Sequence, residues 1–417
     1  MRDNFMTAMF RSLRHRDFRA YFIGQMVSYI GTWMQQVAMA WLAYRISGSV
    51  LVLGLVGFAS QFPILLFAPF GGVFSDRHDR RRLMILTQSL SLLQTLVLAA
   101  LTFSGLVEVW HLLALAVWLG LINAVDTPAR QSIISMLVRD RSDLANAIAL
   151  NSFAMNSARF LGPALAGFLV SLSGEGVCFL LNGASYAVVV VALLRIRLGH
   201  KAPQRQPLLK VLREGVAYTW NSKPIRTLLG IVATISFLLT PVVVFMPFYA
   251  REVFHGDART LGLLMSCSGI GSLLGAGVLA SRRNVALVAW MVSKAPFLAA
   301  ASLMAFSFST VLWLSMPLLV LVGLGMIMTV ASSNTIIQTL VHDHFRGRVM
   351  SYFTVAFLGM APLGSLAAGS VAHHLGVPAT LFGGCVLGIG VLAWLTRRLQ
   401  GLDSHLKAAR VREGLPG

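Results

Sequence analysis

The most constraining feature of this 417-residue sequence is a series of long, continuous apolar runs. A helix needs about 20 apolar residues to cross the roughly 30 Å hydrocarbon core of a bilayer. Twelve runs reach this length: 18–44, 51–74, 83–104, 109–129, 144–172, 175–197, 225–250, 258–281, 285–309, 311–335, 348–372 and 377–397. They do not resemble the alternating strands of about ten residues that build membrane barrels, so membrane-spanning helices are predicted. The first run is too long for a signal peptide and is expected to be retained.

The charged residues are few and unevenly distributed. Only 12% of the residues are charged, against roughly 25% in soluble proteins, and the net charge is +19. Of 34 Lys and Arg residues, 29 fall at the N-terminus, in the even-numbered loops or in the C-terminal tail. The odd-numbered loops hold only Arg45, Arg251 and Arg259. Because loops on the cytoplasmic side collect Lys and Arg, both termini are predicted to be cytoplasmic, and the basic character needs no nucleic-acid partner.

Two segments of the first half recur in the second half. Residues 72–77, Gly-Val-Phe-Ser-Asp-Arg, correspond to residues 277–282, Gly-Val-Leu-Ala-Ser-Arg, at an offset of 205. Residues 132–140 correspond to residues 335–343 at an offset of 203. Such symmetry is typical of two bundles related by an axis along the membrane normal. The predicted fold is an all-α integral membrane protein with twelve transmembrane helices in two six-helix bundles.

This symmetry divides the chain into four parts. They are an N-terminal bundle at 1–197, a cytoplasmic linker at 198–224, a C-terminal bundle at 225–400 and a cytoplasmic tail at 401–417. Within the linker, Leu208, Leu212, Val216 and Trp220 recur at helical spacing. An amphipathic helix is therefore predicted over 207–221, lying either on the membrane surface or between the bundles without lipid contact.

The most specific local motif follows the second run and reads Gly72-Val-Phe-Ser-Asp76-Arg77-His-Asp79-Arg80-Arg81-Arg82. It resembles the loop 2–3 signature of the major facilitator superfamily, G-x-x-x-D-R-x-G-R-R, with Asp79 at the usual second glycine. Together with segments 126–131, 158–167 and 346–351, it resembles the drug- and siderophore-exporting branch, which includes the enterobactin exporter and macrolide efflux proteins. The resemblance covers nearly the whole chain and implies a transporter of the bacterial inner membrane.

The resemblance also implies that contacts around this loop latch the two bundles on the cytoplasmic side. Asp76 lies next to a helix N-terminus, whose positive dipole end favours a carboxylate, and Arg80 could reach Asp126 on a neighbouring helix. The residues assigned to the latch are Gly72, Asp76, Arg77, Arg80, Asp126 and Arg130. Alternatively, the arginines only anchor the topology. The second-half copy has Ser281 in place of Asp76, so a single latch is expected.

Gly162-Pro163-x-x-x-Gly167 in the fifth run resembles the superfamily's antiporter motif, G-P-x-x-G-G. Proline and small residues let membrane helices kink and pack closely, which would limit ion leakage. The alternative is a structural kink without a role in export.

Polar side chains inside the apolar runs are expected to face protein or water rather than lipid. The candidates for contact with a substrate in a central cavity are Gln25, Tyr29, Thr32, Trp33, Gln36, Asn123, Ser152, Asn156, Arg159 and Asn334. Interhelical hydrogen bonding is the alternative for the first run. Arg159 could bind an anionic substrate or pair with polar groups of a neighbouring helix. Lys294 is expected to snorkel to the membrane surface.

The expected function is secondary active export of small amphipathic molecules, drugs or siderophores, by alternating access. The sequence has no nucleotide-binding, nucleophile or metal-ligand motif, so neither enzyme activity nor a cofactor is expected. The branch implies proton antiport, and Asp126 is the best single candidate for the carrier although it lies near a cytoplasmic end. The alternatives are a lysophospholipid or lipid translocator of the same fold and an uncoupled facilitator. The expected partners are the substrate and the lipid bilayer, and the chain is expected to be a monomer.

Overall fold

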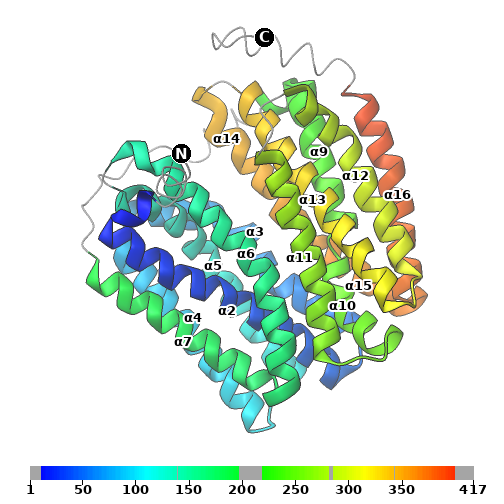
Figure 1. Cartoon of the computed structure of the whole chain (residues 1–417), viewed down its shortest axis with the longest axis horizontal. Helices are drawn as coiled ribbons and strands as arrows, with labels where there is room; N and C mark the ends of the chain where they lie inside the picture. The colour runs from blue at the N-terminus through cyan, green and yellow to red at the C-terminus, as the bar shows by residue number, and fades with distance from the viewer. Residues whose placement is uncertain (1–10, 139, 197–217, 281–284, 342, 400–417) are drawn as a thin grey trace, which may run out of the picture. The chain divides into compact units, whose positions relative to one another are not determined.

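The computed structural model describes residues 11–138, 140–196, 218–280, 285–341 and 343–399, and all regular secondary structure in these ranges is helical (Figure 1). The elements of the first half are η1 (Arg11–Arg14), α2 (Arg16–Ser47), α3 (Val50–Arg77), α4 (Arg80–Phe103), α5 (Val109–Leu137), α6 (Arg141–Ser173) and α7 (Glu175–Arg195). Those of the second half are α9 (Lys223–Leu238), α10 (Val242–Phe248), η2 (Tyr249–Val253), α11 (Ala258–Ala280), α12 (Val285–Ser307), α13 (Leu312–Leu340), α14 (Asp343–Thr354), η3 (Val355–Gly359), α15 (Met360–Leu375) and α16 (Val377–Arg397). η1 is a 3-10 turn, whereas η2 and η3 are π-helical segments.

The helices coincide with the predicted apolar runs, apart from a few residues at the ends of runs and a short break in the seventh. Within the described residues, 11 helices are long and apolar enough to cross a membrane. The remaining run is α2, which has 32 residues but is less apolar because it carries Gln25, Gln35 and Gln36. The prediction of an all-helical membrane protein is confirmed.

The chain forms two compact units. Unit 1 comprises Met1–Gly48, Ala59–Gln204 and Gly256–Ser266, and unit 2 comprises Ser49–Phe58, Arg205–His255 and Cys267–Gly417. The first turns of α3 thus belong to unit 2, and the first turns of α11 belong to unit 1. Most of the predicted linker at 198–224 and the predicted tail at 401–417 lie outside the described residues.

Unit 1 has a core of apolar side chains. It includes Phe18 and Tyr21 of α2, Met84 of α4, Ile133 of α5 and Val189 of α7. A chain of buried polar groups runs beside this core. Gln35 Nε2 donates to Gln94 Oε1 at 3.1 Å, and Asn182 Nδ2 donates to Gln35 Oε1 at 2.5 Å. These hydrogen bonds satisfy amide groups that would be costly in lipid, which explains how α2 can be less apolar than its neighbours.

Unit 2 is held by apolar packing and by glycines at helix crossings. Met291, Ala295 and Met328 form a buried cluster between α12 and α13. Nearby, a Cβ on Gly325 would lie 2.7 Å from the carbonyl oxygen of Ala295, so only glycine fits this crossing. The eleventh run is interrupted by the π segment η3, where the buried Ser236 hydroxyl of α9 donates to the Phe357 carbonyl.

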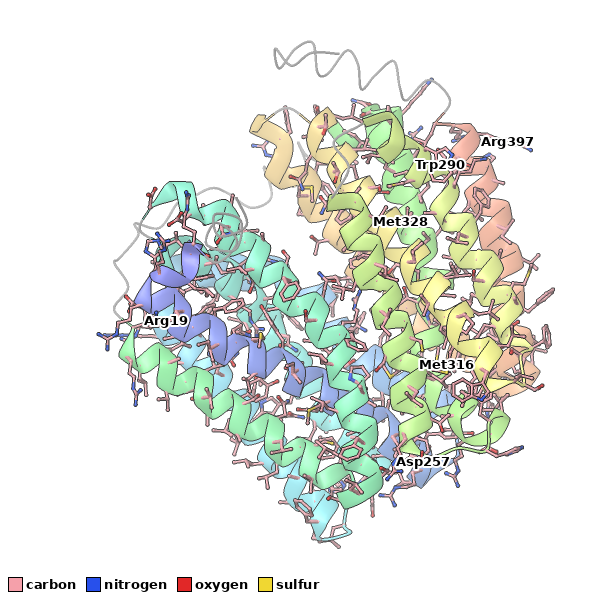
Figure 2. The ribbon with its side chains drawn as sticks, in the orientation of Figure 1. Arg19, Asp257, Trp290, Met316, Met328 and Arg397 are labelled. Atoms are coloured by element: carbon pink, nitrogen blue, oxygen red, sulfur yellow. The ribbon has the colours of Figure 1, made fainter. Side chains whose placement is uncertain are left out.

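Large apolar side chains stay exposed on the helices of both units. Trp290 on α12 and Trp394 on α16 are both more than half exposed, and Figure 2 shows Trp290 among them. A soluble protein would not leave so many such groups in contact with water, so these surfaces fit contact with lipid.

The end of the predicted amphipathic helix 207–221 is described from Tyr218 onward. The Tyr218 ring stacks on the Phe345 ring of α14, with a centroid distance of 4.4 Å and an interplanar angle of 11°. Arg226 of α9 lies over the Trp220 ring at 5.2 Å. The last turn of this segment therefore packs on α14 and α9 within unit 2, while the rest of it lies outside the described residues.

Candidate functional site

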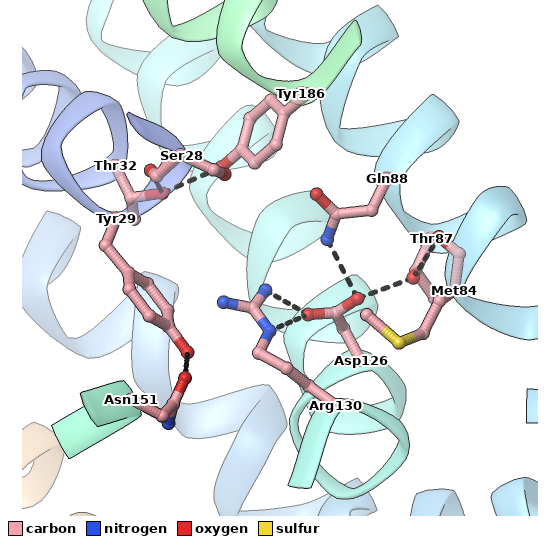
Figure 3. Close-up of polar contacts among 10 residues, drawn as sticks. All are labelled: Ser28, Tyr29, Thr32, Met84, Thr87, Gln88, Asp126, Arg130, Asn151 and Tyr186. Atoms are coloured by element: carbon pink, nitrogen blue, oxygen red, sulfur yellow. Dashed lines mark hydrogen bonds and ion pairs between the residues drawn. The ribbon is translucent and has the colours of Figure 1, made fainter. Parts of the chain in front are cut away.

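The best-defined polar centre of unit 1 is the carboxylate of Asp126 on α5, and the residue is 1% exposed. It forms an ion pair with Arg130, one turn later on the same helix. From α4, Thr87 Oγ1 donates to Asp126 Oδ1 at 2.6 Å and Gln88 Nε2 donates to the same oxygen at 2.9 Å (Figure 3). Both carboxylate oxygens are therefore satisfied, and a buried charge is neutralised where lipid could not solvate it.

Tyr29 on α2 connects this ion pair to α6. Its ring lies under the Arg130 guanidinium, with 5.3 Å between Cζ and the ring centroid. Its hydroxyl donates to Asn151 Oδ1 on α6 at 3.2 Å (Figure 3). Three residues further along α2, the Thr32 hydroxyl lies 3.3 Å from the Tyr186 hydroxyl of α7. The polar centre around Asp126 thus joins α2, α4, α5 and α6, and the Thr32–Tyr186 contact links α2 to α7.

Several buried polar atoms on the same helices have no hydrogen-bond partner among the described residues. They are both amide atoms of Gln25, the hydroxyls of Tyr21 and Ser28, and Gln88 Oε1. Tyr21 and Tyr29 lie close enough to Arg130 to interact with its charge. Buried polar atoms without a protein partner are normally satisfied by water, so this region is suited to holding internal water.

A second charged group, Arg159, lies on α6. Its Cζ is 5.3 Å from the centroid of the Trp33 ring on α2. Among the described residues, no carboxylate and no hydrogen-bond acceptor contacts its guanidinium, and the side chain is half-buried. Arg159 differs in this respect from Arg130, which is neutralised by Asp126.

The other predicted substrate contacts are spread over three helices. Gln36 on α2 and Ser152 on α6 are exposed, and Asn123 on α5 is half-buried. Asn156 Nδ2 donates to the Ser152 carbonyl at 2.8 Å. Asn334 lies on α13 of unit 2, where Gln338 Nε2 donates to its Oδ1 at 2.6 Å. Contact with substrate stays a prediction for all of them.

The predicted latch is only partly described. Gly72, Asp76 and Arg77 lie in the last turns of α3, in a stretch whose side chains fall outside the described part of the chain. Arg80 Nη1 lies 3.7 Å from Met136 Sδ on α5. The described partners of Asp126 are Arg130, Thr87 and Gln88, so the contact expected between Arg80 and Asp126 is not formed in this structure.

Two residues of this loop have roles that the sequence did not reveal. Asp79 is the N-cap of α4, where its Oδ1 accepts a hydrogen bond from the Arg82 backbone N–H at 2.9 Å. This role explains an acidic residue where the related motif has glycine. Arg81 donates to the carbonyls of Leu193 and Leu194 at 2.7 and 2.8 Å, at the negative end of the α7 dipole.

The glycines of the Gly162-Pro163-x-x-x-Gly167 segment lie at two helix crossings within unit 1. A Cβ on Gly162 would overlap the Trp33 side chain of α2. A Cβ on Gly167 would lie 2.6 Å from the Ala258 carbonyl oxygen and 3.0 Å from Gly262 Cα, both on α11. The segment therefore provides close packing, as either interpretation of the motif requires.

The partners of Asp126 were not predicted from the sequence. Thr87 and Gln88 belong to a buried polar stripe on α4 that continues through Ser91, Gln94 and Thr95. This stripe recurs at helical spacing inside an apolar run, which is the signal that could have revealed it.

No metal centre is found in the described part of the chain. No three His, Cys, Asp or Glu side chains there lie close enough together to hold an ion. Cys178, Cys267 and Cys385 are free and buried in apolar surroundings.

Comparisons with known proteins agree with this architecture. A family model described as transmembrane secretion effector matches residues 7–414. The staphyloferrin A transporter of Staphylococcus aureus is 26% identical over 378 residues, covering 89% of this chain and 93% of that protein. The multidrug efflux pump Tap of Mycolicibacterium fortuitum is 27% identical and covers 88% and 92%. Macrolide efflux protein A of Streptococcus pyogenes is 23% identical and covers 93% and 97%.

Solved structures share the fold. A bacterial homologue of the human lysosomal transporter Spinster superposes with a TM-score of 0.74 at 18% identity, covering 94% of this chain and 98% of that one. A bacterial homologue of the iron transporter ferroportin gives a TM-score of 0.66 at 15% identity, covering 91% and 98%. At these identities the likeness is one of fold alone.

Proposed function

Because this chain belongs to the transmembrane secretion effector family of major facilitator transporters, we propose that it exports drugs or siderophores across the bacterial inner membrane by proton antiport with alternating access. The names of its relatives support this substrate class, since they are transporters or efflux proteins for staphyloferrin A, for multiple drugs and for macrolides. Export by such a chain draws on an ion gradient or a concentration gradient, because its sequence has no nucleotide-binding motif.

The main support for coupling export to a proton gradient is the burial of Asp126. In the structure α5 continues past Asp126, which lies eight residues from the end of the span Val109–Ile134, whereas Asp143, Glu175 and Glu252 lie at or next to the ends of theirs. An ionisable group inside the membrane that is held by specific partners is a functional candidate by default. A proton carrier needs such a group, reachable by water from one side at a time.

The surroundings of Asp126 suggest how a proton would act there. Protonation of its carboxylate would cancel the ion pair with Arg130, because the neutral acid has no charge to offer the guanidinium. Arg130 rests on the ring of Tyr29, whose hydroxyl is bonded to Asn151 of α6. A change in the charge of Asp126 would therefore be transmitted to α2 and α6. The unpaired polar atoms of Gln25, Ser28 and Gln88 provide sites for the water that brings the proton.

A transport experiment tests this proposal. Drugs and siderophores are first screened for reduced accumulation in a host that lacks its own efflux pumps. For a compound that is exported, uphill and downhill transport are then measured in proteoliposomes with an imposed pH gradient. Asp126→Asn is expected to lose uphill export while keeping downhill flux of the compound.

The control is Glu108→Gln, which removes an exposed carboxylate at the other end of α5 and is expected to export normally. Uphill export that continues after the proton gradient is dissipated would contradict antiport. Downhill flux alone in the wild type, indifferent to the pH gradient, would identify an uncoupled facilitator.

A further inference from the structure

Arg159 lies near the middle of a candidate membrane span. The span Asp143–Ser173 extends 16 residues before it and 14 residues after it. At about 1.5 Å per residue, either end of the span is roughly 20 Å away. An arginine or lysine reaches the membrane surface by snorkelling only near a helix end, so Arg159 cannot place its charge in the headgroup region.

Lys294 shows the contrast. It lies 6 residues from the start of the span Val288–Ser307, or roughly 9 Å, and its side chain is exposed. Its ammonium is near enough to the start of the span for snorkelling to the membrane surface, which stays a prediction. Lys294 and Arg159 therefore have different environments. Of the two, only Arg159 needs an anionic partner to offset its charge.

The described residues give Arg159 an aromatic platform but no neutralising group. The Trp33 ring faces its guanidinium at 5.3 Å, and an aromatic face attracts a cation without cancelling its charge. The ion pairs described in unit 1, such as Arg130 with Asp126 and Arg45 with Glu175, join a basic side chain to a carboxylate, and Arg159 takes part in none of them. Arg159 is thus an uncompensated cation at a depth where an unpaired charge is costly.

Neutral polar side chains share the helix faces of Arg159 and Trp33. A Cβ on Gly162 would overlap the Trp33 Cβ, so α6 and α2 approach closely beside the ring that faces the guanidinium. Ser152 and Asn156 precede Arg159 on the same face of α6, and Ser152 is exposed. Gln36, one turn after Trp33 on α2, is exposed as well. These neutral side chains can donate hydrogen bonds to an anion and would not repel it.

We propose that Arg159, resting on Trp33, binds a carboxylate or phosphate group of the molecule that the protein transports. A guanidinium matches either group through two parallel hydrogen bonds, and the indole provides an apolar surface for the rest of the molecule. The inference rests on the proposed export function and narrows its substrates to amphipathic anions. An amphipathic cation would be disfavoured at this site by charge repulsion.

Equilibrium binding to the purified protein in nanodiscs tests the inference without any proton gradient. The probes are fluorescein, which carries a carboxylate, and rhodamine 6G, a cation built on the same xanthene ring, each followed by fluorescence anisotropy. Arg159→Gln is expected to weaken fluorescein binding at least tenfold and to bind rhodamine 6G at least as tightly as the wild type. Arg159→Lys keeps the positive charge, so it is expected to lose less fluorescein affinity than Arg159→Gln does. Lys294→Gln is the matched control and is expected to bind both dyes as the wild type does.

Two lipids distinguish the source of the anion. Lysophosphatidylglycerol carries a net negative charge, whereas lysophosphatidylcholine does not. Competition by the first lipid alone, lost in Arg159→Gln, assigns the site to an anionic lipid headgroup. Fluorescein binding that neither lipid displaces, but that depends on Arg159, assigns it to a soluble anion.

Other outcomes overturn the inference. They are a wild type that binds rhodamine 6G but neither fluorescein nor lysophosphatidylglycerol, a wild type that binds none of the probes, and an Arg159→Gln variant that retains full anion binding. An equal loss of both dyes in Arg159→Gln, with unchanged thermal stability, also overturns it. Anion binding that depends on Arg159 in a protein that shows no transport would instead refute the proposed function and leave the anion site standing.

Discussion

Arg45, at the end of α2, and Glu175, at the start of α7, form a bidentate ion pair. Arg45 Nε donates to Glu175 Oε1 at 2.8 Å, and Nη2 donates to Oε2 at 3.1 Å. The carboxylate side chain is only 7% exposed, whereas the arginine is 50% exposed. A buried carboxylate depends on its partner more than an exposed one does, so this pair fixes the ends of two helices that are distant in sequence.

Arg45→Ala is expected to destabilise unit 1, because it leaves the buried Glu175 carboxylate without its charged donor. The expected loss is about 1–3 kcal/mol. It is measured as a lower midpoint of thermal unfolding in detergent. Arg251→Ala is the control, since Arg251 and Glu252 lie 3.8 Å apart and are each about half exposed. Equal midpoints for the two variants would show that the Arg45–Glu175 pair contributes no more than a surface pair.

Gly167→Ala is expected to impair both stability and transport. The added methyl group would meet the Ala258 carbonyl oxygen at 2.6 Å, so α6 and α11 would have to separate. Overpacking of this kind costs about 1–3 kcal/mol. Gly390→Ala on α16 is the matched control, because nothing lies within 4 Å of a Cβ there. The prediction fails if Gly167→Ala has the thermal midpoint and export rate of Gly390→Ala.

The sequence predicted the spans because each needs only a long apolar run, a local property. It also marked Asp126 and Arg159 as exceptional, since each is a charge inside an apolar run. The partners of these charges could not be predicted from the sequence, because they depend on how each helix is rotated about its axis relative to its neighbours. Arg80 is placed well enough along the chain to meet Asp126, yet Thr87 and Gln88 on the same helix occupy that carboxylate.

The polar residues of α2 also show that helical periodicity alone does not predict which neighbour a side chain meets. Helical periodicity puts Gln25, Tyr29 and Gln36 on one face, but the structure buries the first two and exposes the third. Gln35, which this periodicity did not select, lies in the centre of the polar chain between Gln94 and Asn182. A face of a helix in a bundle is divided among several neighbours, and the sequence alone does not say which part faces which neighbour.

Asp79→Ala is expected to loosen the start of α4, because alanine cannot accept the hydrogen bond from the Arg82 N–H. Loss of an N-cap costs about 1 kcal/mol, whereas glycine at the same position costs only a few tenths. Asp79→Gly, which restores the usual residue of the related motif, is therefore expected to have a thermal stability closer to that of the wild type than Asp79→Ala has. Thermal midpoints of the two variants check this order, and the reverse order would contradict the capping role.

Asp76→Asn is expected to reduce export at least tenfold while leaving membrane insertion intact. Asparagine has nearly the same shape as aspartate but lacks the charge that a latch to neighbouring arginines requires. Insertion is checked by the amount of monodisperse protein extracted from membranes, and export by the rate of substrate loss from loaded cells. Ser281 stands at the equivalent position of the second half, so Ser281→Ala is expected to export normally. Normal export by Asp76→Asn would show that the charges of this loop serve only to anchor the topology.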